Sequence, residues 1–381
     1  MEQKGKKPAS WRRTVFSAAL ALMLIALGLC WPDILDGRAA QVEQYYSETV
    51  YQAIRRAISR ATSLVPFSLA EILLYALILL AAGLILLRTV QWIVRRSGFH
   101  RLVKSVVALA LTAGVLLNLF YVTWGFNYFR EPLSERMELC VGQRSTDELE
   151  TFVLDTAAEA KALRETLHED DNGVFAPEES LQSVLNGLPQ AYENLSAAFP
   201  VFPADVTRAK RVFWSTGLSV QGISGVFVGL TAEPNVNDDQ PPLLLYHAAA
   251  HEMAHQTGIA SENEADFTAC LACAFSDDAN VRYSGLIYAL IVSGNALYKA
   301  DPAAYIAAAE TYGDAVWRDL ADYDAYWDAF DGEVQQSADR RNDAYLKHNS
   351  QSSGIASYGE SVDLLLAFAA RYGSVWSAAQ G

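Results

Sequence analysis

The chain has 381 residues, of which 51% are hydrophobic and 19% are charged, and its formal net charge at pH 7 is −15. The apolar content is too high for a disordered protein, and the acidic balance argues against a nucleic-acid partner. The length suits two or three structural units.

The charge is unevenly distributed along the chain. Residues 1–13 contain five basic residues and one acid, and residues 88–104 contain five basic residues and no acid. From Trp124 to the end, 15 basic residues stand against 38 acidic ones. The two parts of the chain are therefore expected to lie in different surroundings.

Three apolar stretches lie next to the basic segments, at about residues 14–31, 67–87 and 105–123. Each approaches the roughly 20 residues that a helix needs to cross the hydrocarbon core. We therefore expect three transmembrane helices, the first of them an anchor rather than a cleaved signal peptide.

The positive-inside rule places the N-terminus and the 88–104 loop in the cytoplasm. This predicts a multi-pass protein of the plasma membrane. Residues 1–123 would form an anchor in the lipid bilayer, and residues 124–381 would form an extracytoplasmic domain.

An amphipathic helix is expected at about residues 40–62, between the first two transmembrane helices. Its apolar residues recur every four positions, at Val42, Tyr46, Val50, Ile54 and Ile58. This spacing predicts an amphipathic helix with the arginines pointing elsewhere. We expect its apolar face to pack on the extracytoplasmic domain, and the alternative is that it lies on the membrane surface. In the second transmembrane stretch, Glu71 lies about one turn from the outer interface and is expected to extend toward it.

The extracytoplasmic domain is expected to be mainly α (α+β), with many helices and a small β-sheet. Ser145 and Glu148 form a capping box that predicts a helix to about His168, and Pro177 opens another helix. Residues 212–230 are the best strand candidate, and the chain after Pro242 is predicted to be helical almost to its end.

The motif that carries chemistry is His251-Glu252-Met253-Ala254-His255. Four residues apart on a helix, His251 and His255 project from one face, where two neutral imidazoles can bind one Zn²⁺ ion. Glu252 then lies beside the metal, in a position that suits a general base acting on water.

A catalytic zinc site takes a third protein ligand. Gly258 predicts the end of the first helix, and Ser261 with Glu264 predicts a capping box that begins a second. On this second helix Glu262 and Asp266 share a face. We expect Glu262 to be the third ligand, with Glu264 as its competitor, and Asp266 to accept an imidazole N–H.

Two further features are expected to be structural. His247 lies one turn before His251; as a fourth ligand it would make the zinc structural, but we expect a hydrogen-bonded core residue. Cys270 and Cys273 continue an apolar helix face and are expected to be buried thiols rather than a redox or zinc pair. The four cysteines show no disulfide pattern.

The sequence resembles a family of bacterial membrane proteins catalogued as domain-of-unknown-function family 3810. The resemblance rests on segments 66–69, 224–227, 233–237, 251–258, 262–267, 282–285, 345–347 and 357–359. The His-Glu-x-x-His helix followed by Glu-x-x-x-Asp is also similar to the gluzincin class of zinc peptidases. That similarity implies a zincin-like domain with His251, His255 and Glu262 as ligands and Glu252 as the base.

These features predict a membrane-anchored zinc metallopeptidase that hydrolyses a peptide or protein substrate on the outer face of a bacterial plasma membrane. A strand near Val226 is expected to pair with an extended peptide. Tyr283 and Tyr358 are candidate donors to the oxyanion, and the alternative for either is an ordinary buried tyrosine. The alternative is a catalytically silent zinc-binding membrane sensor or scaffold. An intramembrane protease is disfavoured, because the apolar run 243–250 is too short to cross a bilayer.

Overall fold

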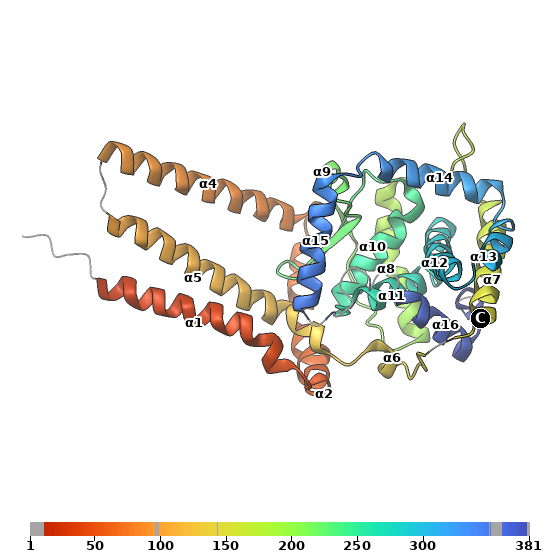
Figure 1. The fold of residues 1–381 in the computed structure, drawn as a ribbon, viewed down its shortest axis with the longest axis horizontal. Helices are drawn as coiled ribbons and strands as arrows, with labels where there is room; N and C mark the ends of the chain where they lie inside the picture. The colour runs from red at the N-terminus through yellow and green to blue at the C-terminus, as the bar shows by residue number, and fades with distance from the viewer. Residues whose placement is uncertain (1–10, 96–98, 143, 350, 352–359, 379–381) are drawn as a thin grey trace, which may run out of the picture.

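The computed structural model describes residues 11–95, 99–142, 144–349, 351 and 360–378 (Figure 1). Three long helices extend from one side of a compact, mostly helical body, which we call the large domain and which follows residue 123. This arrangement confirms the expected fold class of a mainly helical chain with three membrane-type helices and a small sheet.

The three long helices are α1 (Trp11–Leu35), α4 (Leu69–Arg95) and α5 (Phe99–Thr123). Within the described residues, three segments are long and apolar enough to cross a membrane: Trp11–Leu35, Leu69–Gln91 and Val103–Thr123. They coincide with the predicted stretches, and the helices extend beyond them by a few residues because helix ends continue into the interface.

Helices α1 and α5 pack closely, because small residues let their backbones approach. A methyl group at Gly28 would collide with Leu117, and one at Gly114 would lie 2.9 Å from Leu24. Asn118 of α5 donates a 2.8 Å hydrogen bond to the carbonyl of Leu24. Helix α4 stands apart from this pair (Figure 1), and none of the residues described in its apolar window is buried.

The connection between α1 and α4 is helical, as expected for residues 40–62. It consists of α2 (Ala39–Val42), the π-helical segment η1 (Glu43–Val50) and α3 (Tyr51–Thr62). It packs on the large domain, but with its polar face. Arg55 is 1% exposed and donates to the carbonyl and carboxylate oxygens of Asp205 at 2.8 and 2.7 Å.

The expectation that the apolar face is the buried one was therefore only partly right: Val42 is 5% exposed and packs with Tyr121 and Phe129. Val50, an apolar residue of the predicted face, is 47% exposed. The polar face can be buried because the large domain supplies hydrogen-bond partners, which offset the cost of removing Arg55 from water.

Two carboxylates tie α4 to the large domain. Glu233 accepts a 2.8 Å hydrogen bond from the backbone N–H of Ala70, at the start of α4. Glu71 accepts hydrogen bonds from the backbone N–H groups of Phe213 and Trp214 at 2.7 and 3.0 Å. Glu71 therefore does not simply extend to solvent, as expected from its position, but satisfies backbone donors of a neighbouring loop.

The large domain begins with short helices and two longer ones: η2 (Gly125–Phe129), a 3₁₀ helix, α6 (Leu133–Arg136), α7 (Thr146–Arg164) and α8 (Leu181–Ala198). The predicted capping box of Ser145 and Glu148 opens α7. Helix α8 begins at Leu181 rather than near Pro177, because Ser180 caps it by accepting from the Ser183 N–H.

A small sheet follows, made of β1 (Lys210–Arg211), β2 (Gly225–Val228) and β3 (Glu233–Val236). The strand order is β1-β3-β2, with β3 parallel to β1 and antiparallel to β2. Within the described residues β2 is thus an edge strand. The expected strand at 212–230 was largely wrong, because residues 215–219 form helix α9 (Ser215–Ser219) and only 225–228 are extended.

The remaining helices are α10 (Pro242–Thr257), α11 (Glu262–Ala274), α12 (Ala279–Ala300), α13 (Pro302–Ala309), α14 (Asp314–Asp328), α15 (Glu333–His348), α16 (Ser361–Tyr372) and α17 (Val375–Ala378). Helices α10, α11 and α12 pack on one another at the centre of the hydrophobic core, with β2 and β3 against α10. Residues 243–257 of α10 are all buried. A helix enclosed on every side must satisfy its polar side chains internally, and this directs attention to its histidines and glutamate.

Candidate metal centre

Helix α10 brings His251, Glu252 and His255 into the centre of the large domain. The helix ends at Gly258, whose φ of 102° lies in the left-handed region that glycine adopts without strain. This turn lets the chain reverse within a few residues and begin α11 at Glu262. The two helices therefore present their side chains to each other.

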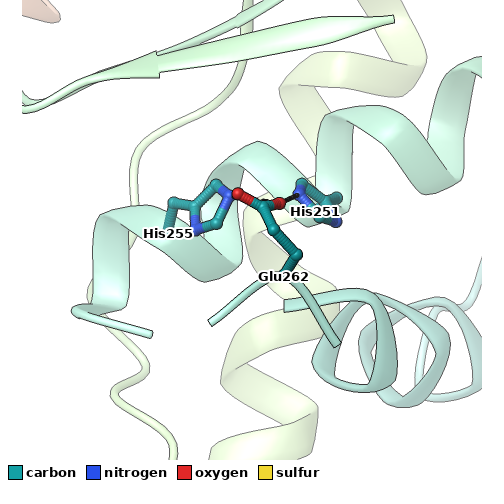
Figure 2. A group of neighbouring side chains, drawn as sticks. All are labelled: His251, His255 and Glu262. Atoms are coloured by element: carbon teal, nitrogen blue, oxygen red, sulfur yellow. Dashed lines mark hydrogen bonds and ion pairs between the residues drawn. The ribbon is translucent and has the colours of Figure 1, made fainter. Parts of the chain in front are cut away.

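The predicted ligands meet at one point, with the Glu262 carboxylate between the two imidazole rings (Figure 2). Glu262 Oε2 lies 3.1 Å from His251 Nε2 and 3.4 Å from His255 Nε2. One ligand atom from each residue lies within 4.8 Å of the others, and all three residues are buried. The structure thus brings together the three residues that were predicted to be metal ligands.

The outer nitrogen of each ring is held by an acceptor. His251 Nδ1 lies 2.7 Å from Asp266 Oδ1, and His255 Nδ1 lies 2.7 Å from the carbonyl oxygen of Ile259. A carbonyl can only accept, so Nδ1 of His255 is the donor in that pair. In a neutral imidazole each Nε2 then carries the lone pair that faces Glu262, which is the orientation required of a metal ligand.

Glu264, the competing ligand, points elsewhere. Its Oε1 accepts a 2.6 Å hydrogen bond from the backbone N–H of Leu133. The capping box predicted for Ser261 and Glu264 was wrong: Ser261 is the N-cap residue, but its side chain makes no capping bond, and its hydroxyl donates to Asn263 instead. Glu264 therefore links α11 to α6 and does not belong to the candidate ligand group of His251, His255 and Glu262.

The two expected structural features agree with the geometry. His247 is 3% exposed and stacks on Tyr288 with ring centroids 3.7 Å apart. Its Nε2 lies 3.4 Å from the carbonyl of Asp266, outside the group of three ligands. Cys270 and Cys273 are buried free thiols, and burial raises the pKa of both.

The electrostatics of the group favour charge separation between its acid and its bases. Burial alone would lower the pKa of His255, but Glu262 raises it above the ordinary value. Conversely, burial would raise the pKa of Glu262, yet His255 and His251 hold it well below the usual range. Glu262 is therefore a carboxylate at neutral pH.

Glu252 of α10 is buried and lies against strand β2. A Cβ added at Gly225 would lie 2.7 Å from Glu252, so only glycine allows this approach of the strand. Burial raises the pKa of Glu252 to about 7, although His251 and His255 oppose the shift. A carboxyl with such a pKa can both take up and release a proton near neutral pH.

A cleft of about 630 Å³ opens over the three candidate ligands. Its lining includes all three ligands and Glu252, the segment 221–227 with strand β2, and residues of α14 and α15. This volume lies in the range of small-molecule and peptide sites.

Aromatic residues that were not selected from the sequence complete the cleft. Trp124, directly after α5, lies edge-on to His255 with ring centroids 5.7 Å apart. The hydroxyl of Tyr128 donates to that of Tyr345 of α15 at 3.1 Å, and both residues line the cleft. Desolvation of the two hydroxyls, with Glu262 nearby, raises the pKa of both tyrosines although Tyr345 as a whole is 40% exposed, so both are neutral at pH 7.

Tyr283, one of the two candidate oxyanion donors, is a buried core residue, which was the alternative for it. It is fully buried and donates a 2.6 Å hydrogen bond to Asp319, and it does not line the cleft. Its position in a buried network with Arg164 is a core contact. Tyr358, the other candidate, lies outside the residues that the structure describes.

Comparison with known proteins identifies the family but not an activity. A family described as "Protein of unknown function (DUF3810)" matches residues 46–366, and the chain belongs to this family. The match spans α4, α5 and the candidate metal centre. No curated protein and no solved structure matches the chain.

Proposed function

We propose that this protein is a membrane-anchored metallopeptidase that holds one Zn²⁺ with His251, His255 and Glu262. The observation that carries the proposal is the convergence of these three buried ligand atoms within 4.8 Å of one another beside Glu252. Two imidazoles and one carboxylate are a donor set typical of catalytic zinc.

The residues fit a cation in a second respect. Both Nδ1 atoms are held by acceptors, so in neutral rings both Nε2 lone pairs point at the Glu262 carboxylate. Lone pairs that face one another repel unless a proton or a metal ion lies between them. A divalent cation would satisfy all three at once.

A bound zinc ion supplies Lewis acidity, which polarises a peptide carbonyl and makes water a better nucleophile. Glu252 would take the proton from the attacking water at its carboxylate and pass it to the leaving amine nitrogen. Its pKa of about 7 suits both transfers.

The cleft offers means to hold an extended peptide. Among the described residues, strand β2 is an edge strand that lines the cleft next to Glu252, and its outer side can pair with a substrate backbone. Tyr345 rather than Tyr283 would donate to the developing oxyanion, because Tyr345 accepts from Tyr128 and keeps its own proton for another acceptor. The acidic balance of the large domain favours neutral or cationic peptides.

The basic segments suggest how the protein is oriented. With residues 1–13 and 88–104 in the cytoplasm, the large domain would lie on the outer face of a bacterial plasma membrane.

Peptide hydrolysis by the full-length protein in detergent micelles tests the proposal. The zinc-loaded protein is incubated with a mixed peptide library, and new termini are identified by mass spectrometry. We expect cleavage by the wild type and a loss of at least about 1,000-fold in Glu252→Gln, which removes the proton acceptor but no ligand.

The matched control is Glu159→Gln, an exposed acid on α7 that should leave cleavage unchanged. Cleavage that persists in Glu252→Gln would contradict the mechanism. A zinc-loaded wild type with no cleavage, together with full cellular function of Glu252→Gln, would favour the sensor or scaffold alternative.

A further inference from the structure

The three long helices define where the bilayer surface lies relative to the large domain. Along each helix, the first basic residue met on moving away from the large domain is Arg13 in α1, Arg88 in α4 and Lys104 in α5. A hydrocarbon core of about 30 Å corresponds to roughly 20 helical residues. Counted toward the large domain, this distance ends close to Asp33, Ser68 and Trp124.

These three end points are consistent with one boundary. All three lie where their helices join the large domain or its helical connection (Figure 1). Two are polar, and the third is a tryptophan, the residue type enriched at membrane interfaces. The hydrocarbon boundary therefore lies directly beneath the large domain, with no spacer between them.

The candidate metal centre lies close to this boundary. Trp124 lines the cleft, and its ring centroid is 5.7 Å from that of His255. In the same aromatic cluster, the ring of Tyr345 lies 6.2 Å from that of Phe120 in the last turn of α5. One layer of aromatic side chains thus separates the metal ligands from the end of a membrane helix.

A second contact fixes the large domain to the start of α4. Glu71, one turn into α4, binds the backbone of Phe213 and Trp214, whose side chains are 70% and 64% exposed. Large exposed aromatic residues at this depth are typical of side chains that rest in the interface. Fixed both here and at the end of α5, the domain cannot lift its cleft away from the membrane.

The membrane beside the cleft is open to another helix. Helices α1 and α5 pack on each other, whereas α4 stands apart and its apolar window has no buried residue among those described (Figure 1). A transmembrane segment of another protein can therefore approach α4 and α5 through the lipid.

We propose that the substrate is a membrane-anchored polypeptide, cut within about ten residues of the end of its transmembrane segment on the side of the large domain. An extended chain advances about 3.3 Å per residue, so such a segment can pass from the boundary to the cleft and along β2. This inference rests on the proposed peptidase function.

N-terminal proteomics of membranes tests the substrate class. Cells that make the full-length wild type are compared with cells that make Glu252→Gln. We expect new N-termini that depend on Glu252 and that cluster within about ten residues of membrane spans, enriched at least fivefold over randomly placed termini.

The outcomes separate the two claims. Glu252-dependent termini in soluble proteins, or far from any span, would overturn the substrate class and leave the peptidase function standing. The absence of any Glu252-dependent terminus would overturn both.

A depth measurement tests the geometry without activity. Single cysteines at Val226 in the cleft and at Glu159 on α7, in a background without the exposed Cys30 and Cys140, carry a fluorophore. The full-length protein is placed in phosphatidylcholine–phosphatidylglycerol vesicles that contain lipids brominated near the headgroup. We expect at least twofold stronger quenching at residue 226 than at 159; equal quenching would overturn the inference.

Discussion

His251 is oriented by one carboxylate, that of Asp266, at 2.7 Å from its Nδ1. Tyr288 is in turn hydrogen-bonded to Asp266, so the acceptor is itself held in place. Partners of this kind fix the ring and its tautomer, and their removal typically weakens metal affinity by 10- to 100-fold.

We therefore predict that Asp266→Ala lowers the zinc affinity of the full-length protein by about 10- to 100-fold. Asp266→Asn, which keeps an oxygen acceptor, should lose less. Competition with a chelating dye measures both values. Wild-type affinity in Asp266→Ala would show that this contact does not orient the ring.

Tyr345 and Tyr283 form a matched pair, because only the first lines the cleft. Tyr345→Phe should lower kcat about 100-fold without loss of zinc, since it removes a donor to the oxyanion. Tyr283→Phe should leave kcat unchanged and lower the free energy of unfolding by about 1 kcal/mol, because it removes the hydrogen bond that the Tyr283 hydroxyl donates to Asp319 in the core. Kinetics and thermal unfolding distinguish the two, and a reversed pattern would restore Tyr283 as the donor.

At the scale of elements, ion pairs hold the helical connection from α2 to α3 against the large domain. Glu43 of η1 is buried against Arg130 and Arg136, with Glu43–Arg distances of 2.5 and 3.0 Å. Burial opposes ionisation, but the two guanidinium groups hold the pKa of Glu43 below its ordinary value of 4.5.

A carboxyl whose pKa is lower in the folded state contributes stability above its unfolded pKa and loses it as the pH falls toward the folded value. We predict that the Tm of the full-length protein in detergent falls as the pH drops below about 4.5. Glu43→Gln should have a lower Tm at pH 7 and a smaller further loss in acid. Parallel curves for both proteins would exclude Glu43 as a source of the acid sensitivity.

The elements that the sequence predicted well are those with a local pattern. The three membrane helices follow from apolar runs, and the pairing of α10 with α11 follows from His251, Gly258 and Glu262 within a few turns of chain. Helix periodicity and a glycine stop are sufficient for such elements.

The elements that were missed depend on contacts between distant segments. Arg55 can be buried because it binds Asp205, which lies 150 residues away in the sequence. Tyr345 is hydrogen-bonded at the cleft to Tyr128, which lies 217 residues earlier. Strand β1 has only two residues and pairs with β3. No local periodicity signals such partners, since the burial of a polar face depends on what the rest of the chain offers.

At the scale of the whole molecule, the proposed orientation predicts which thiols are accessible. Cys140 is exposed in the large domain, whereas Cys270 and Cys273 are buried. In a Cys30→Ala background, a membrane-impermeant maleimide added to intact cells should label Cys140. A matched protein with Cys140→Ser and Arg101→Cys should be labelled only after the membrane is opened. The opposite result would place the large domain in the cytoplasm.

Zinc content of the purified full-length protein tests the central claim most directly, with Glu262→Gln and Glu264→Gln as a matched pair. These two acids lie on the same helical turn of α11, yet only Glu262 faces His251 and His255. We predict about one zinc per chain in the wild type and in Glu264→Gln, and little in Glu262→Gln. A wild type without zinc, or equal zinc in Glu262→Gln, would contradict the proposed centre.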